Sequence, residues 1–421
     1  MTSSHIDTLI VFIKGERAGS IIHHENGRLS FAYKDGYSGN PLSASMPISN
    51  KPYDDRHIRP YLMGLLPDST DVRRAVAREY DVSANNPFAL IAHIGLDLPG
   101  AVQVCANERD VERCEAYREI TDSDIESRLA ELIERDGASW LGLGEHWSLG
   151  GQQSKIALAG FDGKWYSCEG SAATTHIIKP GITRLKFQAL NEHYCLSLAS
   201  ACGIPSAKSE YLHFGDVPAI VVKRFDRIVH EPFAVERLHQ EDVCQALGVL
   251  PSQKYASDGG PSSIDVVRLL GNGANATSNI KTFAAQLLFN YLIGGIDAHA
   301  KNYSLTYFDG DDYVLSPMYD AASVLPYDTE GRHIRLAMSI GGENRLGLLS
   351  KNDLGRYADA AGLDRGYVAE LMEKIATSIL ENGREVAERE VIPFGGEELA
   401  DRLLPKLDAA CEKTLAMLAR S

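Results

Sequence analysis

The amino-acid sequence predicts an α+β fold with a β-rich first half and a helical second half. Short runs of β-branched and apolar residues, separated by turn residues, dominate the first third of the chain. In the last third, apolar residues recur at helical spacing over long segments. No internal repeat or low-complexity tract interrupts this division. We therefore expect a functional site in the cleft between the two halves.

The N-terminal region is expected to begin with a small antiparallel sheet. Residues 8–13 form a β-branched, apolar run, residues 14–19 have the composition of a turn, and a second strand follows at about 20–23. Asn26-Gly27 is the signature of a type I′ hairpin, and it precedes a strand at 29–33.

Two amphipathic helices are predicted next. Pro67-Asp68-Ser69 is typical of a helix start, and the residues that follow it place Val72, Val76 and Tyr80 on one helical face. Residues 122–135 form the second helix, with Asp122 or Ser123 as its N-cap.

The middle of the chain returns to strands and turns around one strong helix. In chain order, we expect a Gly-containing turn at 148–155, a strand at 156–159, a hairpin turn at Asp162-Gly163, a strand at 175–180, a helix at 190–203, and a buried strand at 219–222 that leads into 223–227.

The final third is expected to be helical. The predicted helices are 239–248, 263–270, 277–294, 351–362, 365–382 and 397–419. We accordingly divide the chain into a β-rich N-terminal subdomain (1–120), a middle lobe (121–257) and an all-helical C-terminal lobe (258–421).

Composition narrows the possible classes of protein. The chain has 421 residues, of which 44% are hydrophobic and 24% charged, as in ordinary globular proteins. Its net charge of −15 argues against bulk nucleic-acid binding, which needs a field of Lys and Arg. The seven cysteines are scattered and form no C-x-x-C pair, so neither a disulfide framework nor a zinc site is expected. With no signal-peptide pattern and no long apolar stretch, we expect a cytoplasmic protein without membrane contact.

One segment carries the residue types that phosphoryl transfer needs. Asp297 is followed five residues later by Asn302, and Asp320 comes after a short apolar segment. Asp297 can accept the proton of an attacking hydroxyl, while Asn302 and Asp320 can hold the magnesium ions that neutralise a triphosphate. The spacing matches the catalytic loop of protein kinases. Two other interpretations remain open: ordinary turn and cap residues, or the Asp-x-His half of a metal-hydrolase site.

A glycine-containing turn in the middle lobe is a candidate phosphate-binding loop. Gly150-Gly151 would let the backbone N–H groups approach phosphates closely, and Lys155 would add a positive charge. Gly-Gly turns are common, however, and the spacing is not that of a Walker motif.

Two further segments have both a functional and a structural interpretation. Lys179 ends a strand, where it could reach nucleotide phosphates with Glu192 as its ion-pair partner. Alternatively, Lys179 protects a sheet edge and Glu192 is a first-turn carboxylate favoured by the helix dipole. Residues 223–227 would place backbone groups against an adenine ring, or they form a solvated loop.

Together these segments resemble the HipA family of bacterial serine/threonine kinases, the toxins of type II toxin–antitoxin pairs. The resemblance covers most of the chain. It is carried by the segments 64–69, 148–155, 176–179, 191–195, 223–227, 237–242, 254–260 and 297–302, together with Asp320. It implies a bilobal protein-kinase-like fold with a β-rich N-terminal subdomain, and it implies ATP and Mg²⁺ as cofactors.

The resemblance implies a role for each matched residue. Asp297 would be the catalytic base, and Asn302 and Asp320 the magnesium ligands. Ser148 would be autophosphorylated, which would switch the kinase off because two negative charges would stand beside a turn built to bind phosphate. The nucleotide would contact Gly150, Gly151, Gln152, Gln153, Ser154, Lys155, Lys179, Lys223, Arg224, Phe225, His299, Ala300, Lys301, Asn302, Tyr319 and Asp320.

The chain departs from the family pattern in two places. Lys223 stands where some members have Glu, so an adenine contact would have to run through the backbone. The loop at 150–154 also lacks the Ala-rich sequence of other members, which would alter nucleotide affinity or the rate of autophosphorylation.

We therefore expect an ATP- and Mg²⁺-dependent protein serine/threonine kinase that arrests growth by phosphorylating a component of translation. The resemblance suggests an aminoacyl-tRNA synthetase as substrate, with glutamyl-tRNA synthetase first. A small DNA-binding antitoxin is the expected partner, through which the acidic protein would reach operator DNA. Two alternatives remain open: a catalytically weak kinase-fold co-repressor that acts with its antitoxin, and a small-molecule kinase.

Overall fold

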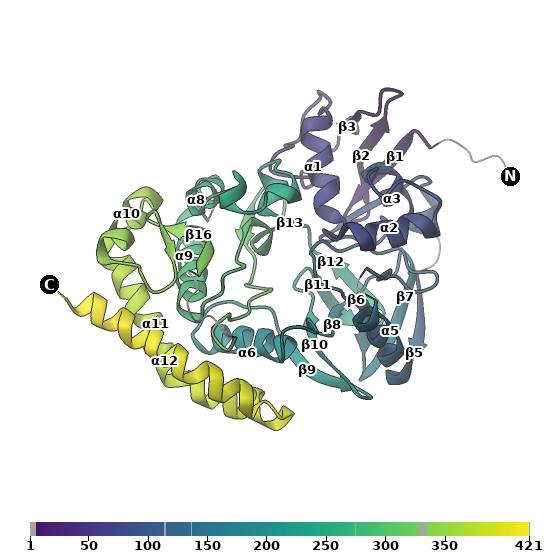
Figure 1. Cartoon of the computed structure of the whole chain (residues 1–421). Coiled ribbons are helices and arrows are strands. Elements are labelled where there is room, and N and C mark those ends of the chain that lie inside the picture. The colour runs from purple at the N-terminus through teal and green to yellow at the C-terminus, as the bar shows by residue number, and fades with distance from the viewer. Residues whose placement is uncertain (1–5, 113–114, 136, 274, 328–333, 421) are drawn as a thin grey trace. The chain divides into compact units, whose positions relative to one another are not determined.

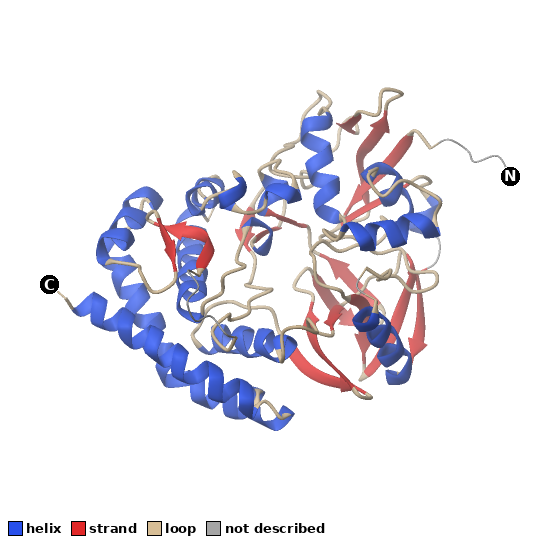
Figure 2. Ribbon diagram, in the orientation of Figure 1, coloured by secondary structure: helices blue, strands red, loops and turns tan. Residues whose placement is uncertain are grey.

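The computed structural model describes residues 6–112, 115–135, 137–273, 275–327 and 334–420 (Figures 1 and 2). The chain folds into two compact units that interleave along the sequence. The first unit comprises residues 1–180, 213–252 and 304–313, and the second comprises 181–212, 253–303 and 314–421. Two strands, β9 (Ser209–Phe214) and β15 (Tyr313–Leu315), run from residues of one unit into residues of the other. The predicted boundaries after 120 and 257 stay predictions.

The first unit begins with a four-stranded antiparallel sheet in the order β3-β2-β1-β4. Its strands are β1 (Thr8–Ile13), β2 (Glu16–His23), β3 (Leu29–Tyr33) and β4 (Val102–Cys105). Leu9, Val11 and Ile13 alternate along β1 and are fully buried, as the two-residue period of a strand requires. The helices α1 (Asp55–Leu65), α2 (Thr70–Glu79) and α3 (Pro87–Ile94) contribute to the same hydrophobic core.

The loop between β2 and β3 differs from the predicted type I′ turn. The last residue pair of the hairpin is His23 with Leu29, so five residues form the loop instead of two. Gly27 has a φ of +78°, but Asn26 does not share a positive φ, and a type I′ turn needs both. The Asn26 side chain instead accepts a hydrogen bond from the Arg28 N–H at 3.0 Å.

A second, six-stranded sheet has the order β5-β7-β6-β8-β10-β9. Besides β9, its strands are β5 (Glu115–Ile120), β6 (Ile156–Phe161), β7 (Lys164–Gly170), β8 (His176–Lys179) and β10 (Val217–Lys223). The expected helix at 122–135 is α5 (Asp122–Glu134), and its cap is Thr121, one residue before the predicted position. The short elements of the first unit are α4 (Arg109–Glu112), β11 (Arg227–Glu231), β12 (Ala234–Arg237), β13 (Gln240–Asp242), α7 (Val243–Ala246) and β14 (Ser304–Tyr307).

The second unit is built mainly from helices. These are α6 (Gln188–Ala201), α8 (Ser263–Leu270), α9 (Ala276–Ile293), α10 (Lys351–Ala361), α11 (Arg365–Glu390) and α12 (Glu397–Ala419). The long helix α11 packs against α6, α9, α10 and α12, and so forms the centre of the unit. In the part of the chain that the structure describes, no helix is long and apolar enough to cross a membrane.

The prediction of an all-helical region at 258–421 is wrong, because strands also occur there. They include β14, β15, β16 (Arg335–Ile340) and β17 (Glu343–Arg345). Burial alternates residue by residue along β16, which is a strand period that the sequence interpretation overlooked. The predicted helix 239–248 is likewise mostly wrong, since residues 240–242 pair as β13 with β14, more than sixty residues later in the sequence.

A buried cluster of five charged side chains lies in the first unit. Asp97 bonds Arg224 (3.3 Å), Arg227 (2.9 Å) and Arg237 (3.2 Å), while Asp226 bonds Arg224 (2.8 Å) and Arg227 (2.9 Å). Burial disfavours the charged form of both aspartates. The attraction of the facing arginines is larger than this effect of burial, so the pKa of each aspartate lies below its ordinary value. Burial is also the main reason why the pKa of Arg227 falls to about 10.

The cluster fixes several backbone segments to one another. Asp97 accepts hydrogen bonds from the backbone and hydroxyl of Thr174 (3.0 and 2.7 Å), and Asp226 accepts one from the Gly100 N–H (2.7 Å). Both Arg224 and Arg227 donate to the Leu98 carbonyl. The cluster therefore joins residues 97–100 to the strand β8 region and to the segment after β10.

Replacing Asp97 with Asn should lower the free energy of unfolding by about 3–5 kcal/mol, because it leaves buried arginines without their counter-charge. The matched control is Asp71→Asn, which removes an exposed pair with Arg74 and should change little. Both are measured by urea denaturation. Folding lowers the pKa of Asp97. The charged carboxylate therefore stabilises the folded protein at any pH above the ordinary aspartate pKa of about 3.9. This contribution is lost as the pH falls through the lower pKa that Asp97 has in the folded protein. The difference in the free energy of unfolding between wild type and Asp97→Asn should therefore become smaller in acid. Equal free energies of unfolding at neutral pH would contradict the role of Asp97 as the buried counter-charge.

Candidate active site

Helix α9 ends in a way that presents Asp297 on an exposed loop. Gly294 adopts a left-handed φ of +67°, and its N–H bonds the Asn290 and Tyr291 carbonyls. A Cβ on Gly295 would lie 2.5 Å from the Asn290 side-chain oxygen, so a larger residue there would displace that side chain. The Ala337 N–H then bonds the Ile296 carbonyl at 3.1 Å and anchors the loop to β16. Asp297 itself is exposed.

The spacing from Asp297 to Asn302 has a structural cause. The Asn302 side-chain N–H group donates to the Asp297 backbone carbonyl at 2.9 Å, and the His299 N–H bonds the same carbonyl at 2.7 Å. The Asn302 N–H in turn bonds the His299 carbonyl at 2.9 Å, within a short 3₁₀ turn at Ala300–Asn302. The nitrogen end of the Asn302 amide therefore holds the loop closed, and the oxygen end is the one that can bind a cation.

The segment before Asp320 returns to this loop. The Tyr319 hydroxyl donates to the Lys301 carbonyl at 2.7 Å, and Met318 exchanges backbone hydrogen bonds with Pro205 and Ala207. Asp320 is exposed and has a φ of +57°, a left-handed conformation that aspartate tolerates better than most residues. Such conformations are concentrated at functional sites.

The side chains at this loop fit magnesium in type. Asn302 and Asp320 offer oxygen donors, and Mg²⁺ is commonly held by one or two carboxylates, with water and phosphate oxygens as its other ligands. Among the described residues, no group of three or more His, Cys, Asp and Glu is placed to hold a metal ion. The metal role of Asn302 and Asp320 stays a prediction.

Tyr255 is a residue to which the sequence analysis gave no role. Its hydroxyl donates to Asp297 Oδ1 at 2.6 Å, and its ring meets the His299 ring edge-on at 4.9 Å. The Ala300 N–H bonds the carbonyl of the neighbouring Lys254 at 3.2 Å. Because Tyr255 and Asp297 are 42 residues apart, no local pattern in the sequence could have paired them.

The predicted phosphate loop lies in the first unit, and Ser148 at its start is buried. Ser148 is 2% exposed; its hydroxyl donates to the Leu65 carbonyl at 2.7 Å, and its N–H donates to the Asp97 carbonyl at 3.1 Å. The loop is therefore connected to α1 and to the residue that holds the buried charge cluster.

The rest of this loop is held by its own lysine and by a neighbouring segment. The Asp68 N–H bonds the Gly151 carbonyl at 2.8 Å, and Gly151 has a φ of +103°, which glycine adopts without strain. Lys155 Nζ donates to the Gly150 carbonyl at 3.0 Å and lies 4.2 Å from the centre of the Trp140 ring. Residues 152–154 complete the turn, with Gln152 exposed.

The structure excludes the structural interpretations of Lys179 and Glu192, which were a sheet-edge lysine and a first-turn carboxylate. Strand β8 has β6 on one side and β10 on the other, so Lys179 does not protect a sheet edge, and it is 6% exposed. Glu192 is the fifth residue of α6 and is buried, so it is not a solvated first-turn carboxylate. The two residues belong to different units, and their ion pair stays a prediction.

Residues 223–227 do not form the solvated loop that was one interpretation. Arg224, Asp226 and Arg227 are buried in the charge cluster, and the Arg224 N–H bonds the Thr175 carbonyl at 2.9 Å. Arg224 thus has a structural role that the sequence analysis did not foresee. Lys223 is exposed at the end of β10, and the contacts of Lys223 and Phe225 with an adenine ring stay predictions.

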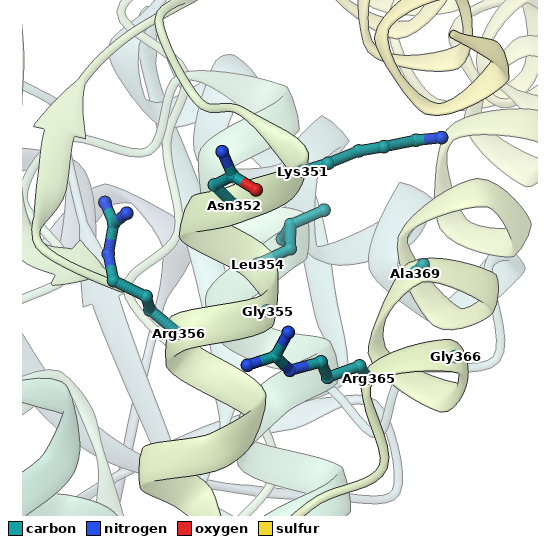
Figure 3. Close-up of a pocket in the computed structure, with 8 residues that line it drawn as sticks. All are labelled: Lys351, Asn352, Leu354, Gly355, Arg356, Arg365, Gly366 and Ala369. Carbon is teal, nitrogen blue, oxygen red and sulfur yellow. The ribbon is translucent and has the colours of Figure 1, made fainter. Parts of the chain in front are cut away.

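A pocket between α10 and α11 is separate from the predicted site residues (Figure 3). Its three cationic side chains are already engaged: Arg356 with Asp353, Arg365 with Asp359, and Lys351 with the Arg420 carbonyl. None of the residues predicted to bind nucleotide or metal is among those that line it: Lys351, Asn352, Leu354, Gly355, Arg356, Arg365, Gly366 and Ala369. We therefore do not assign the reaction to this pocket.

The arrangement around Asp297 is compatible with a kinase-type phosphotransferase: an exposed aspartate, an asparagine that closes its loop, and a second aspartate on a segment bonded to that loop. Comparison with known proteins identifies the family. Residues 147–382 match the HipA-like C-terminal domain, and residues 9–105 match the HipA N-terminal domain. The chain belongs to the HipA family of kinases.

Individual relatives match this chain in sequence over most of its length. The Sinorhizobium fredii protein Y4mE is 31% identical over 392 residues, covering 91% of this chain and 92% of its own length. The serine/threonine-protein kinase toxin HipA of Shewanella oneidensis is 30% identical over 355 residues, covering 81% and 80%. The structure of S. oneidensis HipA, solved with HipB and operator DNA, superposes with a TM-score of 0.85 at 26% identity, covering 97% and 98%. The family and the mixed α and β class predicted from sequence are thus confirmed.

Introducing a negative charge at Ser148 should open the loop. Ser148→Asp places a carboxylate in a buried site and removes the donor to the Leu65 carbonyl, which should cost about 1–3 kcal/mol of stability or more. We expect faster protease cleavage within 148–155 and a lower urea midpoint. Ser154→Asp, at a half-buried position of the same loop, should leave both unchanged. Equal cleavage of the two variants would show that the Ser148 contact does not hold the loop.

Proposed function

We propose that this protein is an ATP- and Mg²⁺-dependent protein serine/threonine kinase that acts as a growth-arresting toxin. The observation that carries the proposal is the hydrogen bond from the Asn302 amide to the Asp297 carbonyl. It fixes the distance between the proposed base and a proposed metal ligand. The bond from Tyr319 to the Lys301 carbonyl supports the proposal, because it connects the Asp320 segment to the same loop.

The proposed roles follow from the chemistry of each side chain. Asp297 accepts the proton of a serine or threonine hydroxyl as its oxygen attacks the terminal phosphorus of ATP, and the bond from that phosphorus to the bridging oxygen breaks to release ADP. Asn302 and Asp320 hold Mg²⁺ through oxygen atoms, and the bound ion would neutralise the charge on the phosphates. Lys179 and the loop at Gly150–Lys155 bind the phosphates. Residues 299–301 and Tyr319 line the nucleotide site.

The proposed partner and substrate extend the relationship with the Shewanella protein. That relative is named a kinase toxin, and its structure contains HipB and operator DNA. We propose that a small DNA-binding antitoxin likewise binds this chain and links it to operator DNA. The net charge of −15 supports contact with DNA mainly through such a partner. As substrate we propose an aminoacyl-tRNA synthetase, with glutamyl-tRNA synthetase tested first.

We also propose that autophosphorylation of Ser148 inactivates the kinase. Because the Ser148 hydroxyl is buried and bonded to Leu65, the loop must leave its position before the hydroxyl can be modified. Once modified, the dianionic phosphate could not return to that site without a large desolvation cost.

The activity is tested by mass spectrometry of the full chain after incubation with Mg·ATP, alone and with the purified synthetase. Wild type should gain phosphate on Ser148 and transfer phosphate to the synthetase, whereas Asp297→Gln should do neither. Calorimetry should show similar nucleotide affinity for both, because Asp297 acts on the proton. Residual transfer by Asp297→Gln above a few per cent would refute its role as base. Transfer to a small alcohol but to no protein would favour a small-molecule kinase.

Removal of the Asp320 carboxylate should abolish Mg²⁺-dependent nucleotide binding. Asp320→Ala takes away the charged metal ligand, so ATP titrated with and without Mg²⁺ should give the same weak calorimetric signal. Asp309→Ala, which removes an exposed carboxylate on a nearby turn in the sequence, is the matched control and should bind like wild type. Wild-type affinity in Asp320→Ala would exclude the proposed metal role.

A further inference from the structure

The proposed base lies on an exposed loop, where its side chain needs support. A general base must be held within hydrogen-bonding distance of the proton that it takes, and small displacements of a reacting group are costly in rate. Asp297 is exposed, and the bonds that close its loop go to its backbone carbonyl, not to its carboxylate. These bonds therefore fix the backbone but leave the orientation of the carboxylate to other contacts.

Tyr255 makes such a contact with the carboxylate. Its hydroxyl donates to Asp297 Oδ1 at 2.6 Å, a length typical of an O–H group bonded to a charged oxygen. One carboxylate oxygen is then committed to the phenol, so Oδ2 is the atom that would face an incoming hydroxyl.

The turn that carries Tyr255 is fixed to the catalytic loop independently of the phenol. The Ala300 N–H bonds the Lys254 carbonyl at 3.2 Å, and the Tyr255 ring packs edge-on against His299.

The same turn is closed by its own backbone. The Gly260 N–H bonds the Tyr255 carbonyl at 3.0 Å, and a Cβ on Gly260 would lie 1.7 Å from the Gln253 carbonyl oxygen. A side chain at position 260 would force this turn open, so the sequence Gly259-Gly260 holds the position of Tyr255.

We infer that Tyr255 is a positioning residue, which orients the Asp297 carboxylate for proton transfer. The inference rests on the proposed kinase function and adds a residue to it. Tyr255 contacts the base, and we assign it no contact with substrate or nucleotide. Its removal should therefore slow phosphoryl transfer without weakening nucleotide binding.

The test is Tyr255→Phe, which keeps the ring against His299 and removes the hydroxyl alone. We expect kcat for phosphate transfer to fall on the order of 10–100-fold, with KM for Mg·ATP unchanged. The matched control is Tyr194→Phe, which removes a buried phenol that donates to the Gly383 carbonyl at 3.1 Å. The control should keep wild-type kcat. Wild-type kcat in Tyr255→Phe, or a loss confined to KM, would overturn the inference.

A double-mutant cycle on protein stability tests the contact between Tyr255 and Asp297 without relying on catalytic activity. Tyr255→Phe and Asp297→Ala should shift the urea midpoint non-additively, because both remove the same hydrogen bond, whereas Tyr194→Phe and Asp297→Ala should be additive. Additive shifts in the first pair would overturn the inference whether or not the protein is active. Absence of transfer by wild type, together with coupling between Tyr255 and Asp297, would instead count against the proposed kinase function and leave the positioning contact established.

Discussion

The buried cluster around Asp97 is the constraint on which the first unit depends. Three arginines share two buried carboxylates, and removing either acid would leave a positive charge without compensation. The ion pairs join segments that are more than one hundred residues apart in sequence. The Asp97 carbonyl also accepts the Ser148 N–H, so the proposed phosphate loop begins at a backbone position that the cluster fixes.

In the second unit, hydrogen bonds to backbone carbonyls hold the Asp297 loop. The Asn302 amide and the His299 N–H both reach the Asp297 carbonyl, and the Tyr319 hydroxyl reaches the Lys301 carbonyl. Each bond uses a backbone group that a short irregular loop would otherwise leave to solvent. These bonds place the backbone of the loop, and the two aspartates, Asp297 and Asp320, remain exposed.

The local elements and the main chemical motif could be predicted from the amino-acid sequence alone. Strands 8–13 and 29–33 and helices 263–270 and 397–419 have the predicted bounds, because alternation and helical periodicity are properties of neighbouring residues. The spacing from Asp297 to Asn302 was visible for the same reason, since the loop closes on itself within six residues. The family was also recognisable from sequence, because its motifs are short and ordered along the chain.

Features that depend on residues far apart in the sequence became visible only in the folded structure. Residues 240–242 became a strand because β14 pairs with them, although their local pattern favoured a helix. Arg224 and Arg227 resembled a solvated loop until Asp97 provided their buried counter-charge. Lys179 lies on an inner strand of its sheet, because β8 pairs with a strand on each side. The Tyr255 hydroxyl bonds Asp297, a residue 42 positions later in the sequence. Periodicity and spacing record only short-range order, whereas pairing, burial and the partners of charged groups are settled by the folded chain.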